Sequence, residues 1–399
     1  MAFCAGCVSF MNLRSIKGKT IVLAVTGSIA AVETIKLVHA LRRKGATVQG
    51  VMSQAACGII HPDALTYATG RPVITRISGM VEHVLFCGDG GCADLLLIAP
   101  CTANTIGKIT AGIDDTPVTT FATTALGRGM PVVIVPAMHH SMYRHPAITE
   151  SIQKLRGWGV TVTDPRIEEG KAKISDTPEI ILACERELFK KPLAGRHVLI
   201  TSGPCREPLD DVRVLTTRST GLMGRALALW AWRLGARVTV VHADSFPVVN
   251  NIRVSSASDM REAVLNICSN EQVDLYISAA AISDFAPEYF SGKIESGKTI
   301  DMRLNPLPKL LPEVTGRYGI PAVGFKLGWN ELEKARKMVR DGIMMVVVNT
   351  PGAMGSFENS VLLIDAFEEK VIEGPKEDVA GMIWEVLLHH PGFRTGGQE

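Results

Sequence analysis

Three of the ten histidines in this chain lie within seven residues of one another, in the segment Pro136-Ala-Met-His-His-Ser-Met-Tyr-Arg-His-Pro146. They are His139, His140 and His145, and an apolar run at 131–135 precedes them. An imidazole ring can bind a metal, transfer a proton near neutral pH or hydrogen-bond a substrate. Adjacent histidines in a loop do not reproduce the ligand spacing of a known zinc site, so metal binding is the weaker interpretation. A substrate clamp and a polar loop at a strand end both stay open.

The composition excludes several functional classes. With 399 residues, 46% of them hydrophobic and 21% charged, the chain is long and apolar enough for two globular domains. Its net charge of +2 gives no reason to expect nucleic acid or an acidic membrane as a partner. No apolar run approaches the roughly 18 residues that span a bilayer. Nine scattered cysteines are typical of a reducing compartment, so we expect a cytoplasmic protein.

The N-terminal half alternates buried strands with helical segments. Strands are predicted at 20–25, 47–52, 94–99 and 131–135, because these runs are almost continuously apolar, as in a sheet covered on both faces. After the first strand, apolar residues recur at helical spacing as far as Gly45, which ends that helix. This alternation predicts a parallel sheet wrapped by helices.

The pattern restarts after a charged, helix-like stretch at 185–191. The predicted strands of the second half are 196–201, 237–241, 274–278, 322–325 and 343–348, followed by a hairpin at 360–364 and 370–372. We therefore predict an α/β protein with two doubly wound, Rossmann-like, three-layer domains whose sheets are mostly parallel. The first domain is expected at 17–190 and the second at 191–399, after a flexible tail at 1–16.

Small and polar residues gather at the carboxyl ends of the first strands, where sheets of this kind bind ligands. Gly27 and Ser28 follow the first strand, Ser53 ends the second, and a turn at 100–105 follows a later one. Hydroxyl donors at helix N-termini suit a phosphate group, although helix capping explains them equally well. Neither half has the glycine-rich motif of a dinucleotide fold, or a P-loop, at its first strand end.

Four segments taken together resemble one family. Thr26-Gly-Ser-Ile-Ala-Ala31, Pro100-Cys-Thr-Ala-Asn-Thr105, the segment 136–143 and His83 in Val81-Glu-His-Val84 occur in the order seen in flavin-dependent cysteine decarboxylases. Residues from about 17 to 390 are similar to the bifunctional phosphopantothenoylcysteine decarboxylase/phosphopantothenate–cysteine ligases of coenzyme A synthesis. The residues that the resemblance implies for FMN binding are Gly27, Ser28, Ser53, Thr102, Ala103, Asn104 and Thr105.

The resemblance also implies catalytic residues for the first half. His83 matches a base near the substrate thiol, which suits a reaction in which the thiol loses its proton as hydride passes to the flavin. The family's proton-donating cysteine is absent from residues 168–175, and Lys173 lies near its place. We therefore expect catalytic roles for His83, Lys173 and one residue of the histidine segment, His139.

The histidine segment matches the clamp that holds the substrate in this family. Met138, His139 and Met142 occupy clamp positions, and His139 replaces an asparagine that holds the substrate carboxylate. Tyr143 replaces a tryptophan. Because an imidazole N–H can donate a hydrogen bond as the amide would, the resemblance favours the substrate clamp over the polar loop.

The second half resembles the ligase. Residues 198–213 and 217–224 match its opening motifs, in which Arg213 and Thr217 are implied to contact substrate. The implied reaction activates the carboxylate of 4′-phosphopantothenate as an acyl-cytidylate, using CTP and Mg²⁺, before cysteine attacks. The residues implied to bind nucleotide are Gly203, Ser278, Ala279, Ala280, Asp284, Lys293, Pro306, Leu307, Pro308, Lys309, Phe325 and Lys337. Nothing in the residues alone separates CTP from ATP or assigns the metal ligands.

We therefore predict an enzyme that makes 4′-phosphopantothenoylcysteine from 4′-phosphopantothenate, cysteine and CTP, and decarboxylates it to 4′-phosphopantetheine with FMN. The resemblance implies homo-oligomers, with trimeric decarboxylase halves and dimeric ligase halves, up to a dodecamer. Three alternatives stay open: a ligase whose flavin half is weak, a non-enzymatic flavin-binding regulator, and a nicotinamide-dependent oxidoreductase.

Overall fold

The computed structural model describes residues 16–168, 171–297, 299–349 and 358–393. The chain divides into two compact units, Met1–Lys190 and Lys191–Glu399. Of the segment expected to be a flexible tail, residues 1–15 lie outside the described residues, whereas Ile16 is fully buried in the core of the first unit. The first unit therefore begins before the expected boundary at residue 17.

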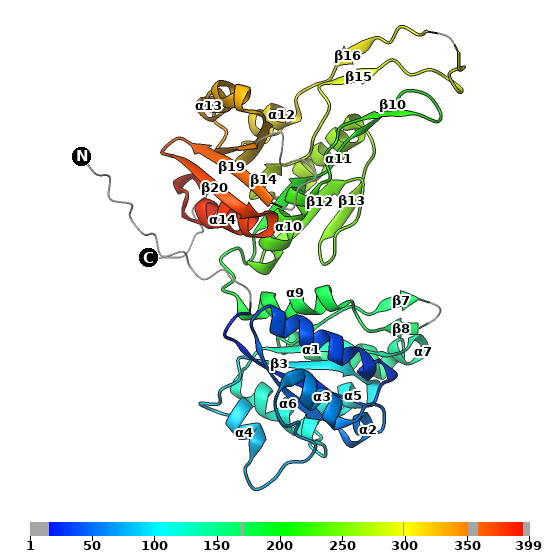
Figure 1. Cartoon of the computed structure of the whole chain (residues 1–399), viewed down its shortest axis with the longest axis vertical. Coiled ribbons are helices and arrows are strands. Elements are labelled where there is room, and N and C mark those ends of the chain that lie inside the picture. The colour runs from blue at the N-terminus through cyan, green and yellow to red at the C-terminus, as the bar shows by residue number, and fades with distance from the viewer. Residues whose placement is uncertain (1–15, 169–170, 298, 350–357, 394–399) are drawn as a thin grey trace, which may run out of the picture. The chain divides into compact units, whose positions relative to one another are not determined.

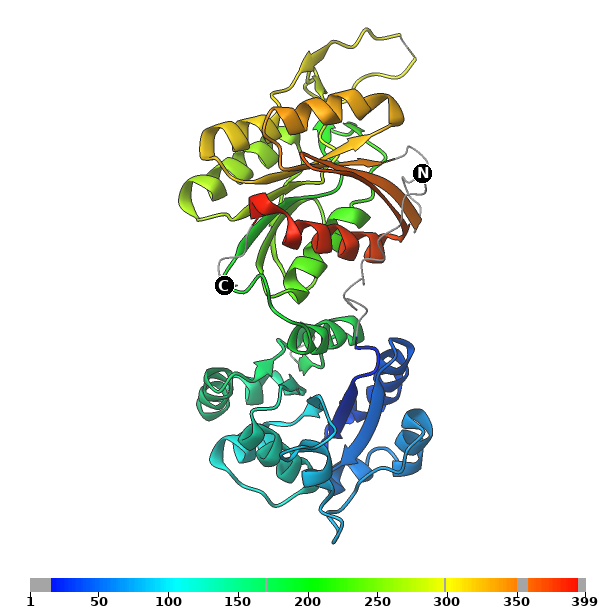
Figure 2. The ribbon, with the colours of Figure 1, turned by 90° about the vertical axis from the view of Figure 1, so that its left-hand side faces the viewer.

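The first unit has a parallel five-stranded sheet between two layers of helices (Figures 1 and 2). In spatial order its strands are β2 (Thr47–Met52), β1 (Thr20–Val25), β3 (Leu95–Cys101), β4 (Val132–Pro136) and β6 (Thr161–Val162). One core lies under helices α1 (Thr34–Arg43), α3 (Pro62–Thr69) and α9 (Thr177–Leu188). The opposite core lies under helices α5 (Ala103–Ala111), α6 (Pro117–Arg128) and α8 (Pro146–Gly157).

Burial on both faces explains why the sheet strands were predictable. Along β1, Ile21, Leu23 and Val25 belong to one core, and Val22 and Ala24 belong to the other. Such strands need apolar residues at every position, which gives a continuous run in the sequence. The predicted strands at 20–25 and 47–52 are confirmed as β1 and β2, and β3 and β4 begin within one residue of their predictions.

A small antiparallel sheet in the first unit was not predicted. Its order is β5-β8-β7, with β5 at Met138–His139, β8 at Lys171–Lys173 and β7 at Arg166–Glu168. Strands of two or three residues carry no periodicity that a sequence pattern can reveal. Four other short elements of this unit are η1 (Ile29–Glu33), α2 (Gln54–Cys57), α4 (Glu82–Cys87) and α7 (His140–Tyr143).

The second unit has an eight-stranded, mostly parallel sheet, which confirms the predicted fold class. Its strands in spatial order are β13 (Asn250–Arg253), β12 (Arg237–His242), β9 (His197–Thr201), β14 (Leu275–Ser278), β17 (Ala322–Leu327), β18 (Met345–Asn349), β19 (Glu358–Asp365) and β20 (Glu369–Pro375). The first six are parallel, and β19 and β20 form the predicted antiparallel hairpin.

Helices cover both faces of this sheet as well. A core cluster joins the sheet to α11 (Ala257–Asn270), α12 (Leu310–Tyr318) and α13 (Leu332–Arg340). Helix α10 (Leu222–Arg233) packs against α14 (Lys376–His389), and the indole Nε1–H of Trp384 donates to the Leu227 carbonyl at 2.9 Å. Short 3₁₀ helices occur at η2 (Trp329–Glu331) and η4 (Pro391–Phe393).

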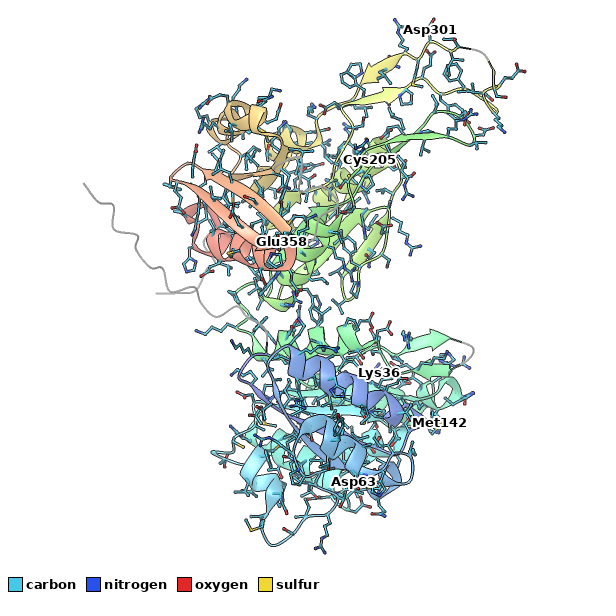
Figure 3. The ribbon with its side chains drawn as sticks, viewed as in Figure 1. Lys36, Asp63, Met142, Cys205, Asp301 and Glu358 are labelled. Atoms are coloured by element: carbon cyan, nitrogen blue, oxygen red, sulfur yellow. The ribbon has the colours of Figure 1, made fainter. Side chains whose placement is uncertain are left out.

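Two hairpins form an arm that extends from the sheet of the second unit (Figure 1). They are β10–β11 (Arg206–Pro208 and Val214–Thr216) and β15–β16 (Phe285–Pro287 and Leu304–Pro306). The amide of Phe290 donates to the Leu209 carbonyl at 2.9 Å, which joins the two hairpins. Asp301 lies near the far end of the arm (Figure 3).

Candidate functional site

The strand ends of the first unit are tied together at its carboxyl edge. The Thr26 hydroxyl after β1 donates to the Pro100 carbonyl at 2.8 Å and accepts from the Thr102 amide at 3.0 Å. The Ser53 amide after β2 donates to the Val25 carbonyl at 3.0 Å. The three turns in which FMN-binding residues are predicted are therefore neighbours in space.

The hydroxyl groups at this edge are helix caps. The side chains of Ser28, Ser53 and Thr102 each accept a backbone N–H in the first turn of η1, α2 and α5. Each hydroxyl keeps its proton for donation, so capping and phosphate binding are compatible. Gly27 is required here by packing, because a Cβ atom would lie 2.5 Å from the Cβ of Ala55. Of the neighbouring predicted residues, Ala103 and Thr105 are buried and Asn104 is exposed.

A cavity of about 520 Å³ lies between the segment after β1 and the small antiparallel sheet. Its walls bring together four predicted residues from three distant parts of the sequence: Ser28, Met138, His139 and Lys173. The predicted FMN residues of the second and third turns do not line this cavity, and neither does Met142, which is 49% exposed on α7 (Figure 3).

Three charged residues of this cavity, Glu33, Arg166 and Asp176, were not predicted from the sequence. Arg166 stands directly opposite Lys173 in the β7–β8 pair, so two cationic side chains share one face of the small sheet. Arg166 Nη1 lies 2.9 Å from a carboxylate oxygen of Asp176, and its Nε–H donates to the Ile174 carbonyl at 3.2 Å. Asp176 occupies the N-cap position of α9 but makes no capping hydrogen bond with its side chain. No sequence motif marks Arg166 or Asp176.

The three histidines of segment 136–146 have separate structural positions. His139 Nδ1 accepts from the Ser141 amide as the N-cap of α7, and His145 Nδ1 accepts from the Ala147 amide as the N-cap of α8. Nδ1 of His140 is buried and has no partner among the described residues. Only His139 lines the cavity. In the described part of the chain, no cluster of three or more His, Cys, Asp or Glu side chains could hold a metal ion.

His83 does not line this cavity. It lies in α4, and its Nδ1 is buried without a hydrogen-bond partner in the described part of the chain. The preceding residue, Glu82, accepts hydrogen bonds from the amide and hydroxyl of Ser78, which lower the pKa of its carboxyl. Val81 has a left-handed backbone with a φ of 47°, which is strained for a β-branched residue. The structure therefore fixes His83 in a constrained turn outside the cavity.

Several large apolar side chains around His83 are exposed. Met80 is 67% exposed, Val81 46%, Val84 43% and Leu85 52%.

The second unit has a cavity of about 160 Å³ at the carboxyl edge of its sheet. Ala279 and Ala280 after β14 and Phe325 on β17 line it, as do residues 219–224 at the N-terminus of α10. Of the other predicted residues, Ser278 directly precedes Ala279 in this wall. Gly203 packs against Gly221, because a Cβ atom built on Gly221 would lie 3.2 Å from the Cα of Gly203. Residues from three separate ligase motifs therefore meet at one edge.

The remaining predicted nucleotide residues lie elsewhere. The Leu307 amide donates to the Asp284 carbonyl at 2.9 Å, and the Lys309 ammonium forms an ion pair with the Asp284 carboxylate. These contacts place Pro306 and Pro308 beside Asp284 as well. Lys293 and Lys337 are exposed, and neither lines the cavity.

The two predicted substrate residues of this unit have different surroundings. Arg213 Nη1 donates to Asp210 at 2.6 Å and to the Ile294 carbonyl at 3.2 Å, so it links the two hairpins of the arm. Although burial acts to raise it, the pKa of Asp210 falls to about 2, because the amides of Ile294, Val212 and Arg213 and the Arg213 guanidinium all donate to it. The Thr217 hydroxyl is buried with no partner among the described residues.

Comparison with known proteins agrees with both halves. A flavoprotein family matches residues 9–188, and the family of the DNA/pantothenate metabolism flavoprotein C-terminal domain matches residues 193–390. The coenzyme A biosynthesis bifunctional protein CoaBC of Thermococcus kodakarensis is 44% identical over 387 residues, covering 94% of this chain and 96% of that protein. The chain belongs to the CoaBC family, the bifunctional decarboxylase and ligase of coenzyme A biosynthesis.

Other CoaBC proteins also match this chain. That of Methanocaldococcus jannaschii is 34% identical over 93% of this chain and 94% of its own. Among solved structures, the C-terminal domain of a CoaBC protein matches 49% of this chain and 95% of that chain, at 32% identity and a TM-score of 0.41. None of the helices in the described residues has the length and apolarity of a membrane span.

Proposed function

We propose that residues 191–399 couple cysteine to 4′-phosphopantothenate through an acyl-cytidylate, and that residues 17–190 decarboxylate the product with FMN. The observation that carries the proposal is the same in both units. In each, residues from separate sequence motifs converge at the carboxyl edge of a parallel sheet, where such folds bind their ligands.

The residues at the edge of the first unit fit FMN. Three hydroxyl groups, those of Ser28, Ser53 and Thr102, stand at adjacent helix N-termini, a setting that suits a phosphate group. FMN, when bound, accepts two electrons from the substrate thiol carbon and returns them after CO₂ has left. The protein's own task is then to bind the substrate, take the thiol proton and supply the final proton.

We assign these tasks to three side chains. His139, in the cavity wall, donates a hydrogen bond to the substrate carboxylate. Lys173 supplies or relays the final proton, in place of the absent cysteine. Arg166, directly opposite Lys173 in the β7–β8 pair, adds a second cationic side chain to this wall. The thiol of Cys101 is a poor substitute, since burial raises its pKa.

His83 takes the thiol proton in this scheme, although it does not line the cavity of its own subunit. The exposed apolar side chains around it support a contact with a second copy of the chain. We infer that His83 of one subunit completes the cavity of another, which makes the proposed oligomer a requirement for decarboxylation.

The second unit supplies a base-sized cavity and dispersed cations for a nucleotide. Phe325, Ala279 and Ala280 line the cavity, and Lys309, Lys293 and Lys337 are candidates for the triphosphate. Among the described residues, no carboxylate lines this cavity, so we propose that Mg²⁺ arrives bound to the nucleotide phosphates, as this ion often does.

Mass spectrometry of products made from 4′-phosphopantothenate, cysteine, CTP and Mg²⁺, with FMN present, tests the proposal. We expect 4′-phosphopantetheine and CMP. Accumulation of 4′-phosphopantothenoylcysteine would instead support a ligase whose flavin half is weak, an outcome that the missing cysteine makes worth testing. If neither product forms from a folded, flavin-loaded protein, the proposal is wrong.

A further inference from the structure

Asn349 lines the cavity of the second unit and was not singled out by any sequence motif. It is the last residue of β18, where it pairs in register with Leu327 of β17. Its side-chain Oδ1 is buried and has no hydrogen-bond partner among the described residues. Leaving a buried acceptor unpaired costs about 1–3 kcal/mol, so a ligand that satisfies it gains this energy on binding.

The lining around Asn349 combines an aromatic ring and small apolar side chains with two lysines, Lys326 and Lys376. Phe325 lies two residues before Leu327 on the same strand, so its ring and the Asn349 carboxamide lie on the same face of neighbouring strands. The small side chains 279–281 form another part of the lining. An aromatic ring can stack on a nucleobase, and small side chains leave room for the ring.

We propose that Asn349 reads the exocyclic amino group of the nucleobase, with Oδ1 as the hydrogen-bond acceptor. This inference rests on the proposed nucleotide-dependent ligase activity and names the part of the nucleotide that the cavity holds. An amino group in that place donates to Oδ1, whereas the keto oxygen of uracil presents a lone pair to it. The cavity therefore selects cytosine over uracil.

The test compares three nucleotides that differ at C4 of the base, where the keto form of uracil also carries a proton on the adjacent N3. They are CTP, UTP and the triphosphate of 2-pyrimidinone riboside, which is cytidine without its amino group. Their dissociation constants are measured by calorimetry on the full-length protein. We expect the wild type to bind CTP about tenfold more tightly than the analogue that lacks the amino group, and UTP no better than that analogue.

Variants of Asn349 separate the acceptor from the rest of the cavity. Asn349→Ala should bind CTP and the 2-pyrimidinone nucleotide equally, which collapses the tenfold preference. Asn349→Asp keeps an acceptor and loses the amide donor, so its preference for CTP over UTP should be at least as large as that of the wild type. Asn359→Ala is the matched control, because Asn359 is another buried carboxamide without partners in the described residues and does not line the cavity.

Each outcome has one meaning. If the wild type binds none of the three nucleotides, the proposed ligase activity fails. If CTP binds but Asn349→Ala keeps the full CTP preference, Asn349 does not read the base. Asn349→Ala could instead lose affinity equally for all three nucleotides, and only when Mg²⁺ is present. That result would overturn the assignment, because it would show that Asn349 contacts the metal–phosphate group.

Discussion

At the scale of single residues, the resemblance implies that the first unit uses two chemical groups that differ from those usual in its family. By that resemblance, His139 takes the position of an amide, and Lys173 lies near the position of a thiol. Both line one cavity, which a sequence match alone could not establish. The two groups beside them, Arg166 and Asp176, had no sequence signal, because only the fold places β7 opposite β8 and turns the α9 cap toward Arg166.

The proton-donor role of Lys173 predicts a selective defect. Lys173→Met should leave flavin reduction and CO₂ release largely intact, and it should slow flavin reoxidation by roughly 100-fold or more, the usual loss when a general acid is removed. Stopped-flow absorbance follows both half-reactions. Lys19→Met serves as the control, since Lys19 pairs with Asp94 at the opposite edge of the sheet. Reoxidation at the wild-type rate in Lys173→Met would rule out the lysine as donor.

The packing of Gly27 predicts a second single-residue effect. Gly27→Ala places a Cβ 2.5 Å from Ala55 in α2, so α2 and its cap Ser53 must move. We expect a loss of about 1–3 kcal/mol in unfolding free energy and a lower flavin content. Gly107→Ala is the matched control: Gly107 lies inside α5 with open space around its Cβ position, and alanine there should stabilise the helix by up to about 1 kcal/mol. Equal flavin content in both variants would contradict the role of this turn.

At the scale of elements, predictability followed burial and length. Strands covered on both faces, such as β1 and β9, are mostly apolar and were located from the sequence. Strands β5, β7 and β8 are two or three residues long, and the arm hairpins are largely exposed, so neither left a pattern. The missed elements carry Met138, His139 and Lys173, whereas the well-predicted strands lead into the turns that were predicted to bind FMN. The sequence pattern therefore located the main sheet but not the short strands that line the first cavity.

The amino edge of the second sheet predicts acid sensitivity. His197 begins β9; its Nδ1 lies 2.7 Å from Arg237 Nη2, and its Nε2 lies 2.9 Å from the Thr239 hydroxyl. Burial first, and then Arg237, lower the pKa of His197, although Glu271 and Asp274 partly oppose this. The unfolded chain therefore binds a proton at a higher pH than the folded one. Stability is complete above the unfolded pKa of about 6.5 and falls as pH drops below it.

Hydrogen exchange of the β9 amides measures this effect. Between pH 7.5 and 5.5, after correction for intrinsic exchange, the opening free energy of β9 should fall in the wild type and fall less in His197→Gln. His242 also has a pKa lowered by burial, so part of the acid loss should persist in that variant. Identical pH dependence in both proteins would show that the pKa of His197 is the same in the folded and unfolded states.

At the scale of the whole molecule, the sequence pointed to two catalytic halves, but it could not show which of the predicted residues line one cavity. His83 is separated from the cavity that holds His139 and Lys173, and exposed apolar side chains surround it. The arm of the second unit likewise exposes Val214, Phe285 and Leu304. A pattern of residue types in the sequence indicates which positions are buried or exposed. Only the folded structure shows which apolar side chains remain on the surface.

A shared active site predicts that two inactive variants restore each other. His83→Asn and Lys173→Met, each expressed alone, should have little decarboxylase activity on supplied 4′-phosphopantothenoylcysteine. When they are co-expressed in equal amounts and assemble at random, about a quarter of the sites should combine an intact His83 from one subunit with an intact Lys173 from another. Product formation should rise to about that fraction of the wild-type rate, and ligase activity should be the same in all three preparations. Light scattering checks that the subunits have mixed. If the mixed assemblies are still as inactive as the single variants, the shared-site proposal is wrong. His83 and Lys173 then act in the same cavity of one chain, or His83 has no role in decarboxylation.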